Sequence, residues 1–263
     1  MESKDESIGI KKFQERLELP VKSDIQVSGH SNTIIFKNDK MYKKAKATET
    51  DFYLCLYGPT SSENLKELIN LIPKFYGVET KNENKYLILE NLNYNCENAN
   101  VMDCKLGKTT WNKEQPLEKI ERKKLKNFIS TTSLVGFRVE GMLIRDNNGN
   151  FTDKIYKQDS LKLIKDKDDI KYFFKKFICE NEEIRGNVLE FIILQIKNLL
   201  DFFKKQNEKC FRASSLYFAI GKNNVHQVKL IDLAYVEDSE GKLDLDLIEA
   251  LEEMLIIWES LTF

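Results

Sequence analysis

The chain has 263 residues, 41% of them hydrophobic, and its 41 Lys and Arg residues nearly balance its 42 Asp and Glu residues. This length suits one large domain or two small lobes, and the hydrophobic fraction supports a folded core rather than a disordered chain. The balanced charge disfavours a general nucleic-acid-binding protein, because such proteins usually carry a basic excess that neutralises phosphates.

The cysteines and the first residues indicate a cellular compartment. Five cysteines occur without a C-x-x-C pair, which argues against a disulfide framework or a zinc knuckle and favours a reducing environment. The opening sequence, MESKDES, is too polar for a signal peptide, and no apolar run approaches the roughly 20 residues that a membrane helix needs. We therefore expect a soluble protein of the cytoplasm or the nucleus, with no membrane segment and no nucleic-acid partner.

The first third of the chain predicts a small lobe of mixed secondary structure over residues 1–90. Its predicted elements are a β-hairpin at 32–44, helices at 48–57 and 61–71, and a buried strand at 86–89. Thr48 is the expected N-cap of the first of these helices.

Residues 91–263 predict a larger lobe, which begins with an Asn-rich connector. Its predicted elements are strands at 101–106, 137–144, 215–220 and 228–231, and helices at 118–126, 185–206 and 243–261. A small mixed lobe joined near residues 90–93 to a larger lobe indicates an α+β, two-lobe, nucleotide-binding enzyme.

Asp103 and Lys105 form the first candidate catalytic pair. Residues two apart on a strand point to the same side. A carboxylate there could accept a proton from an attacking hydroxyl, and an ammonium could neutralise charge on a transferring phosphoryl group. Gly107 would let the backbone approach a ligand closely. By itself this D-x-K spacing is common and is more often a surface ion pair.

Three other charged residues extend this pattern. Asp232 ends an apolar strand, where a magnesium ligand would be useful. Lys43 of the early hairpin could reach nucleotide phosphates, and Glu49 of the next helix could hold it by ion pairing. Each is unremarkable alone, but their order along the chain is the order of parts in kinase-type phosphotransferases. The Gly-rich loop and H-R-D tripeptide of protein kinases are absent, as is a Walker-type phosphate loop.

At these residues the sequence resembles the inositol polyphosphate kinases. Residues 99–107 read ANVMDCKLG and match the family signature P-x-x-x-D-x-K-x-G except that Ala99 replaces the proline. Further blocks follow in the family's order: QVSGH at 26–30, YKK at 42–44, ETDFY at 49–53, LILENL at 87–92, STTS at 130–133, GFRVEGM at 136–142, SSL at 214–216 and IDLA at 231–234. The blocks at 26–30 and 130–142 are most similar to those of hexakisphosphate kinases.

The resemblance implies a kinase-like fold in which ATP, with Mg²⁺, lies in the cleft between the lobes. The residues implied to bind ATP are Lys43, Glu90, Leu92 and Asp232, with Glu90 and Leu92 acting through their backbone groups. Asp232 would also hold the metal, with Ser214 nearby. Asp103 would orient or deprotonate the acceptor hydroxyl, and Lys105 would bind the substrate or the transferring phosphate.

A basic run at residues 119–126 is the candidate clamp for a polyphosphorylated ring. Lys119, Arg122, Lys123 and Lys126 fall on one face of the predicted helix. A solvated helix face is the usual explanation of such a run, and the position of this one between two family blocks makes the ligand-binding interpretation equally strong. Lys108 and Lys113 are further candidates for substrate binding.

The resulting prediction is a monomeric, ATP-dependent kinase of inositol polyphosphates that converts the hexakisphosphate to a diphosphoinositol product. The alternative within the enzymes is a multikinase of tris- and tetrakisphosphates. A different class, a non-catalytic inositol phosphate sensor, is disfavoured by the presence of Lys43, Asp103, Lys105 and Asp232. The sequence does not define the ring position that is phosphorylated.

Overall fold

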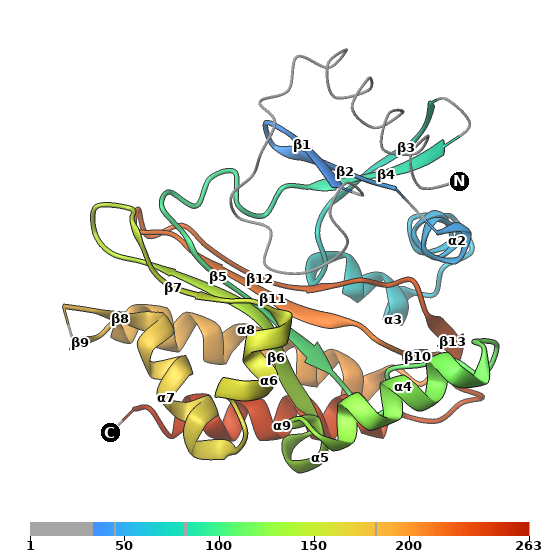
Figure 1. Ribbon diagram of the computed structural model, residues 1–263. Coiled ribbons are helices and arrows are strands. Elements are labelled where there is room, and N and C mark those ends of the chain that lie inside the picture. The colour runs from blue at the N-terminus through green and yellow to red at the C-terminus, as the bar shows by residue number, and fades with distance from the viewer. Residues whose placement is uncertain (1–33, 45, 82–83, 182, 263) are drawn as a thin grey trace, which may run out of the picture.

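The structure is a computed structural model of the chain, in which residues 34–44, 46–81, 84–181 and 183–262 are described. The family block at 26–30 lies outside these residues, as does the start of the predicted hairpin. Two sheets dominate the fold, and Figure 1 shows the smaller one lying over the larger one. The predicted α+β, two-lobe, kinase-like fold is thus confirmed.

The smaller sheet is four-stranded and antiparallel, in the order β1-β2-β4-β3. Its strands are β1 (Ile34–Lys37), β2 (Lys40–Lys44), β3 (Phe75–Lys81) and β4 (Asn84–Glu90). The helices of this region are α2 (Ala47–Leu56), the short α3 (Glu63–Lys66) and the 3₁₀ helix η1 (Glu67–Asn70).

The larger sheet is five-stranded and antiparallel, in the order β12-β11-β5-β6-β7. Its strands are β5 (Asn100–Leu106), β6 (Phe137–Arg145), β7 (Phe151–Ile155), β11 (Ser215–Ile220) and β12 (His226–Ile231). Two small ribbons accompany it: β8 (Cys179–Glu180) with β9 (Glu183–Ile184), and β10 (Lys209–Phe211) with β13 (Val236–Asp238).

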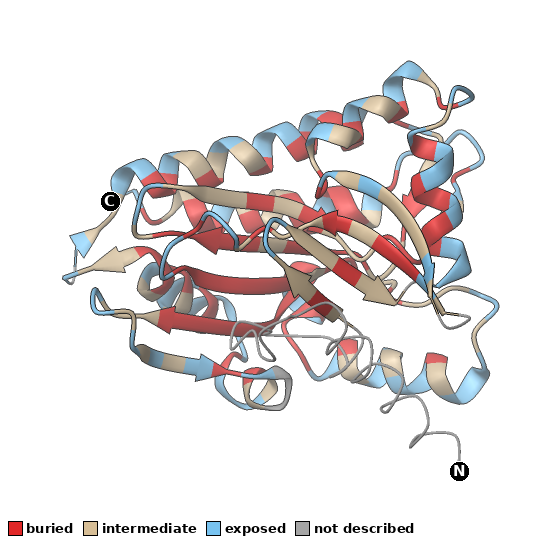
Figure 2. Ribbon diagram, turned by 90° about the horizontal axis from the view of Figure 1, so that it is seen from above, coloured by how far each residue is buried: buried red, intermediate tan, exposed pale blue. Residues whose placement is uncertain are grey.

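Helices cover the side of the larger sheet that faces away from the smaller one (Figure 1). The helices there are α7 (Lys167–Ile178), α8 (Gly186–Lys205) and α9 (Leu245–Glu259), and the remaining helices are α4 (Leu117–Phe128), α5 (Thr132–Val135) and α6 (Lys157–Leu163). In α8, residues such as Val188, Ile192 and Ile196 repeat at helical spacing and are fully buried. Figure 2 shows the buried residues gathered along the larger sheet and on the inner sides of the long helices.

The alternation of β5 separates core residues from site residues. Met102, Cys104 and Leu106 are fully buried in the main core. Because successive strand residues point to opposite faces, Asp103 and Lys105 lie on the other face, toward the smaller sheet. The strand therefore presents its charged pair to the space between the two sheets.

Several predictions of local structure were wrong. The helix expected at 61–71 is divided into α3 and η1, and β3 was not foreseen. Thr48 is not an N-cap: α2 is preceded by Lys46, and the Thr48 hydroxyl instead donates to the Ala234 carbonyl at 2.7 Å. That bond ties the start of α2 to the segment that follows Asp232. In the described part of the chain, no helix combines the length and apolar character needed to cross a membrane.

Candidate active site

Charged side chains that are far apart in the sequence meet between the two sheets. Lys43 lies on β2, Lys105 on β5, and Asp232 directly after β12. Lys43 Nζ is 2.8 Å from Asp232 Oδ1, and Lys105 Nζ is 3.5 Å from Asp232 Oδ2. Glu49 of α2, which is buried, accepts a second bond from Lys43 at 2.8 Å. We call Lys43, Glu49, Lys105 and Asp232 the inter-sheet cluster.

The charges of this cluster stabilise one another. Desolvation disfavours the charged form of Asp232, but the ammonium groups of Lys43 and Lys105 outweigh it and hold the pKa of that carboxyl well below its usual range. Desolvation likewise disfavours charged Lys43, but Asp232 and Glu49 outweigh it and raise the pKa of Lys43. Lys43 and Asp232 are therefore both ionised at neutral pH, and the Asp232 side chain is still 41% exposed.

An unusual backbone conformation positions Asp232 at the end of β12, between the two sheets. Its φ is +64°, in the left-handed region that a side chain other than Gly, Asn or Asp rarely adopts. In the connection between β10 and β11, Ala213 is also left-handed, at φ +57°, and its carbonyl accepts a bond from Lys105 Nζ at 2.8 Å. The local turns thus fix both ends of the Lys105–Asp232 pair.

Asp103 lies beside the cluster and is almost fully buried, with 1% of its surface exposed. It is opposite Gly141 on β6 and Tyr217 on β11, and the β5–β6 register shifts between Asp103 and Cys104. Burial raises the pKa of Tyr217, and the charge of Asp103 adds to this effect. Asp103 therefore shares a strand face with Lys105 at a site from which water is largely excluded.

The basic helix α4 contributes Lys123 to this region. Lys123 Nζ donates to the Thr110 carbonyl at 2.6 Å and lies 5.3 Å from the centre of the Tyr235 ring. Burial and then the positive charges of neighbouring cations lower the pKa of Lys123 to about 8. Those cations are Lys119, Lys105, Lys46 and Arg138. This convergence of like charges marks a place prepared for an anion.

A second set of charges joins α4 to β6. Glu140 accepts bonds from Lys126 Nζ at 2.8 and 2.9 Å and from Arg138 Nε at 2.8 Å. Arg138 also donates to Asn127 Oδ1 at 2.7 Å and to the Thr132 hydroxyl at 3.0 Å. We call Lys126, Arg138 and Glu140 the buried triad, since Arg138 and Glu140 are nearly inaccessible to solvent.

The comparisons with known proteins identify the family of this chain. The family model described as inositol polyphosphate kinase matches residues 86–259, which is more than half of the chain. The chain belongs to the inositol polyphosphate kinase family.

Curated relatives within the family support the assignment. The chain is 27% identical over 252 residues to an inositol polyphosphate multikinase of Schizosaccharomyces pombe, covering 83% of this chain and 89% of that protein. It is 34% identical over 136 residues to an inositol polyphosphate multikinase of Saccharomyces cerevisiae, covering 51% of this chain but only 37% of that protein. The chain therefore spans most of the length of the first relative and well under half of the second.

A solved structure establishes the likeness of the fold. The inositol phosphate multikinase of S. cerevisiae, solved in complex with ADP and Mn²⁺, superposes with a TM-score of 0.72 at 22% identity. The match covers 85% of this chain and 99% of that chain.

The residues around Asp232 fit a divalent metal that arrives with a nucleotide. Among the described residues, no three His, Cys, Asp or Glu side chains are grouped to hold a metal by themselves. Mg²⁺ in phosphotransferases commonly takes one or two carboxylates and completes its shell with phosphates and water. Ser214 directly precedes β11 and Asp232 directly follows β12, beside the Ser215–Ile231 pair, and the buried Ser214 hydroxyl has no hydrogen-bond partner within the described residues. An anionic and a neutral oxygen donor are thus both at hand.

The predicted adenine contacts lie where β4 leaves the smaller sheet. The Glu90 N–H already donates to the Lys74 carbonyl at 2.8 Å. The Glu90 backbone group that could contact adenine is therefore its carbonyl. Leu92 is buried, and its carbonyl accepts a weak bond from the Cys96 thiol at 3.4 Å. The predicted role of these two residues stays a prediction.

The candidate substrate residues lie in several different places, and one of them, Lys126, belongs to the buried triad. Lys105 is in the inter-sheet cluster, and Lys119 is half-buried and acts on Lys123. Arg122 is exposed on α4. Lys108 faces α9, because its N–H donates to Asp246 at 2.6 Å and its Nζ pairs with Glu249 at 3.3 Å. Lys113 is exposed and lines a separate cavity of about 360 Å³ beside β10 and β13.

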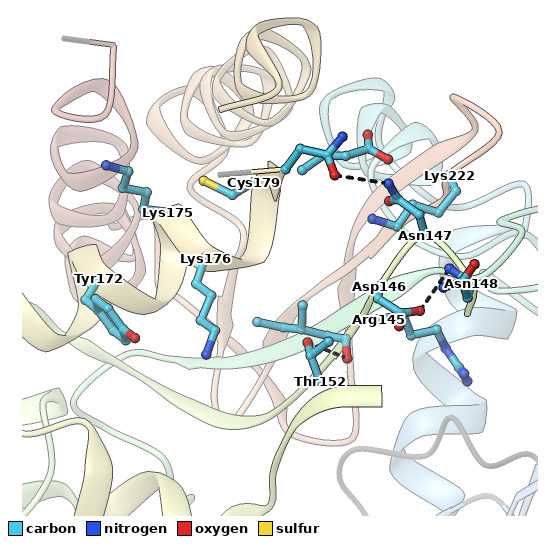
Figure 3. A pocket seen from close by; sticks show the side chains of 13 residues that line it. Arg145, Asp146, Asn147, Asn148, Thr152, Tyr172, Lys175, Lys176, Cys179 and Lys222 are labelled. Carbon is cyan, nitrogen blue, oxygen red and sulfur yellow. Dashed lines mark hydrogen bonds between the residues drawn. The ribbon is translucent and has the colours of Figure 1, made fainter. Parts of the chain in front are cut away.

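A larger cavity, of about 950 Å³, does not involve the predicted site. It is lined by the β6–β7 turn, the end of α7 and the β8–β9 ribbon (Figure 3), and it includes none of the predicted residues. Its charges are largely satisfied locally: Lys176 pairs with Asp153 at 2.8 Å, and Arg145 donates to the Gly149 carbonyl at 2.6 Å. Its lining nevertheless includes four cations, Arg145, Lys175, Lys176 and Lys222.

Sequence reasoning missed Lys46 and Tyr235. Lys46 Nζ donates to the Tyr235 hydroxyl at 2.8 Å and lies 4.3 Å from the centre of its ring. Burial opposes ionisation of Tyr235, but the bond from Lys46 and nearby positive charges outweigh it and lower the pKa of Tyr235. The only signal in the sequence was the closeness of Lys46 to Glu49 and of Tyr235 to Asp232. The Tyr235 ring thus has the ammonium groups of both Lys46 and Lys123 near it.

Proposed function

We propose that this protein is an ATP- and Mg²⁺-dependent inositol polyphosphate kinase of the multikinase type, acting on tris- and tetrakisphosphates. The observation that carries the proposal is the meeting of Lys43, Lys105 and Asp232 between the sheets, with Asp103 on the same strand face as Lys105. The multikinase names of its relatives favour this substrate class over the hexakisphosphate.

The nucleotide would lie between the two sheets, with adenine near Glu90 and Leu92. Its phosphates would approach Lys43, and Asp232 would exchange a lysine partner for the metal. A bound Mg²⁺ would neutralise charge on the phosphates and hold the γ-phosphoryl group in line for transfer. Glu49 would keep Lys43 in place, because it holds the other side of the ammonium at 2.8 Å.

Transfer itself would use Asp103 and Lys105. The Asp103 carboxylate would take the proton of an inositol hydroxyl as that oxygen bonds to the γ-phosphorus and ADP leaves. Lys105 would neutralise the charge that grows on the equatorial oxygens, in a site where partial burial strengthens the interaction. The converging cations around Lys123 would hold the ring phosphates.

A turnover assay tests the proposal. The full chain is incubated with ATP, Mg²⁺ and a panel of inositol phosphates from tris- to hexakisphosphate, and products are separated by anion exchange. The expected result is phosphorylation of the tris- and tetrakisphosphates. Preferred turnover of the hexakisphosphate would favour the second candidate, a hexakisphosphate kinase, which rests on the blocks at 26–30 and 130–142. Binding without turnover of any compound would indicate a sensor. A monomeric state and a cytoplasmic or nuclear location complete the proposal.

A further inference from the structure

Glu140 is a buried carboxylate for which the transfer reaction has no direct use. It is 3% exposed, and it engages both cations of the buried triad, Lys126 and Arg138. Arg138 already has acceptors in Asn127 and Thr132.

The triad borders the proposed substrate site. Arg138 is directly opposite Lys105 in the β5–β6 register, and directly paired strand residues share a face. Glu140 bonds to Arg138 on that face, and its charge acts on Cys104 together with the charge of Asp103. Lys126 belongs to the same face of α4 as Lys119 and Lys123.

Glu140 makes two neighbouring lysines of α4 electrostatically different. The charges that act on Lys123 are those of other cations. Lys126, in contrast, has both carboxylate oxygens of Glu140 within 2.9 Å. A ring phosphate that approached Lys126 would have to compete with this carboxylate and would meet its repulsion. The clamp therefore offers fewer effective positive charges than its sequence suggests.

We propose that Glu140 is a specificity-determining residue, which limits how many ring phosphates the substrate site accepts by offsetting one of the two positive charges of Lys126 and Arg138. This inference rests on the proposed function, because it concerns the substrate of the same site. Repulsion from Glu140 falls most heavily on the substrate with most phosphates, so it selects tris- and tetrakisphosphates against the hexakisphosphate.

The test compares Glu140→Gln with Asp153→Asn in the full chain. Gln keeps the shape of the side chain and an oxygen that can accept from Arg138. Asp153→Asn also removes a carboxylate that pairs with a lysine at 2.8 Å, but it lies opposite Ile144 of the main core, on the helix-covered face of the sheet. Calorimetry measures the affinities for inositol tris- and hexakisphosphate, and turnover with each is measured in parallel.

Glu140→Gln is expected to raise the affinity for the hexakisphosphate relative to the trisphosphate by roughly tenfold, the worth of one charge-assisted contact. The gain should shrink at high salt. Asp153→Asn should leave the ratio unchanged, and Glu140→Asp, which keeps the charge, should stay close to wild type. An unchanged ratio in folded Glu140→Gln, or the same change in Asp153→Asn, overturns the inference.

A second comparison applies if Glu140→Gln does not fold. Because Glu140 neutralises Lys126, Lys126→Gln should weaken trisphosphate binding less than Lys123→Gln. An equal or larger effect of Lys126→Gln overturns the inference. Turnover by the wild-type protein tests the proposed function separately. If the wild type transfers phosphoryl to none of the compounds but Glu140 still controls the binding ratio, the kinase function is rejected and the role of Glu140 in substrate selection is kept.

Discussion

The inter-sheet cluster and the buried triad have similar chemistry but different positions in the fold. The cluster joins β2 and α2 to β5 and the end of β12, and its Lys43 and Asp232 side chains are 19% and 41% exposed. The triad joins α4 to β6 alone, and its Arg138 and Glu140 side chains are 7% and 3% exposed. Charges that bridge separate elements and stay partly exposed can change partners when a ligand enters. Charges buried between packed neighbours hold the architecture, because breaking them leaves an uncompensated charge.

Asp232→Asn is the sharpest test of the cluster. Turnover should fall roughly a thousandfold, because metal-bridged phosphates lose the carboxylate that orients them. The fold should survive, since Asn tolerates the left-handed backbone at φ +64° and Lys43 keeps Glu49. The free energy of unfolding should drop less than on loss of a fully buried ion pair, because the Asp232 side chain is 41% exposed. Steady-state kinetics and urea denaturation measure the two quantities.

The control for this change is Asp238→Asn, which removes a carboxylate from an exposed pair with Lys209. It should leave turnover at the wild-type level. Near-wild-type turnover in Asp232→Asn would remove Asp232 from the site.

Glu140→Ala should lower the stability of the protein far more than Asp232→Asn does. Removal of the carboxylate leaves Arg138 buried without its ionic partner, and the free energy of unfolding should fall by about 3–5 kcal/mol. Urea denaturation measures the loss, and the exposed pair Glu240–Lys242 supplies a control in Glu240→Ala, where the change should stay within about 0.5 kcal/mol. A loss for Glu140→Ala as small as that of the control would mean that the triad does not hold α4 on β6.

Lys123 should make both ligand binding and protein stability depend on pH. Its pKa is lowered from 10.5 to about 8, so the folded, ligand-free protein releases this proton as pH rises through about 8. A bound polyanion favours the charged form, so binding near pH 8 should take up protons and should weaken as pH rises further. The stability of the ligand-free protein changes in the opposite direction. Charged Lys123 destabilises the fold below about pH 8, and this destabilisation is relieved as pH rises toward 10.5.

Calorimetry in buffers of different ionisation enthalpy measures this proton uptake. Lys123→Arg is the control, because a guanidinium stays charged over the whole range and should remove the uptake. An identical pH dependence in wild type and Lys123→Arg would assign the uptake to the ligand instead.

The sequence predicted the cluster better than the triad, for physical reasons. Strand alternation places Asp103 and Lys105 on one face, and an apolar strand that ends in Asp232 exposes its carboxylate. Both are local patterns. The triad depends on the register shift between Asp103 and Cys104, where β6 has one residue more than β5. No local pattern shows which lysine of α4 such a shift will meet, so Lys126 looked equivalent to Lys123.

The predicted elements show the same limit. The long helix α8 and the strands β5 and β11 have clear periodicity and were predicted within a residue or two. The ribbon of β10 and β13 was missed, because each strand has three residues and their pairing joins segments that are distant in the sequence. The position of Tyr235 above Lys123 depends on the loop that leads into that ribbon, and the site was incomplete without it.

The smallest expected effect is that of Arg122→Ala. Arg122 lies on the same helix as Lys119, Lys123 and Lys126, but it is exposed, whereas the three lysines are half-buried. An exposed charge acts on a distant ligand mainly through solvent, so the KM for inositol trisphosphate should rise by no more than about twofold. Lys123→Ala, at a desolvated position, should raise this KM roughly tenfold or more.

Raising the ionic strength should remove the effect of Arg122→Ala first, since salt screens exposed charges most strongly. A rise in KM for Arg122→Ala equal to that for Lys123→Ala, and persistent in high salt, would show that the bound ring reaches the outer side of α4, and the clamp would then extend beyond the half-buried face.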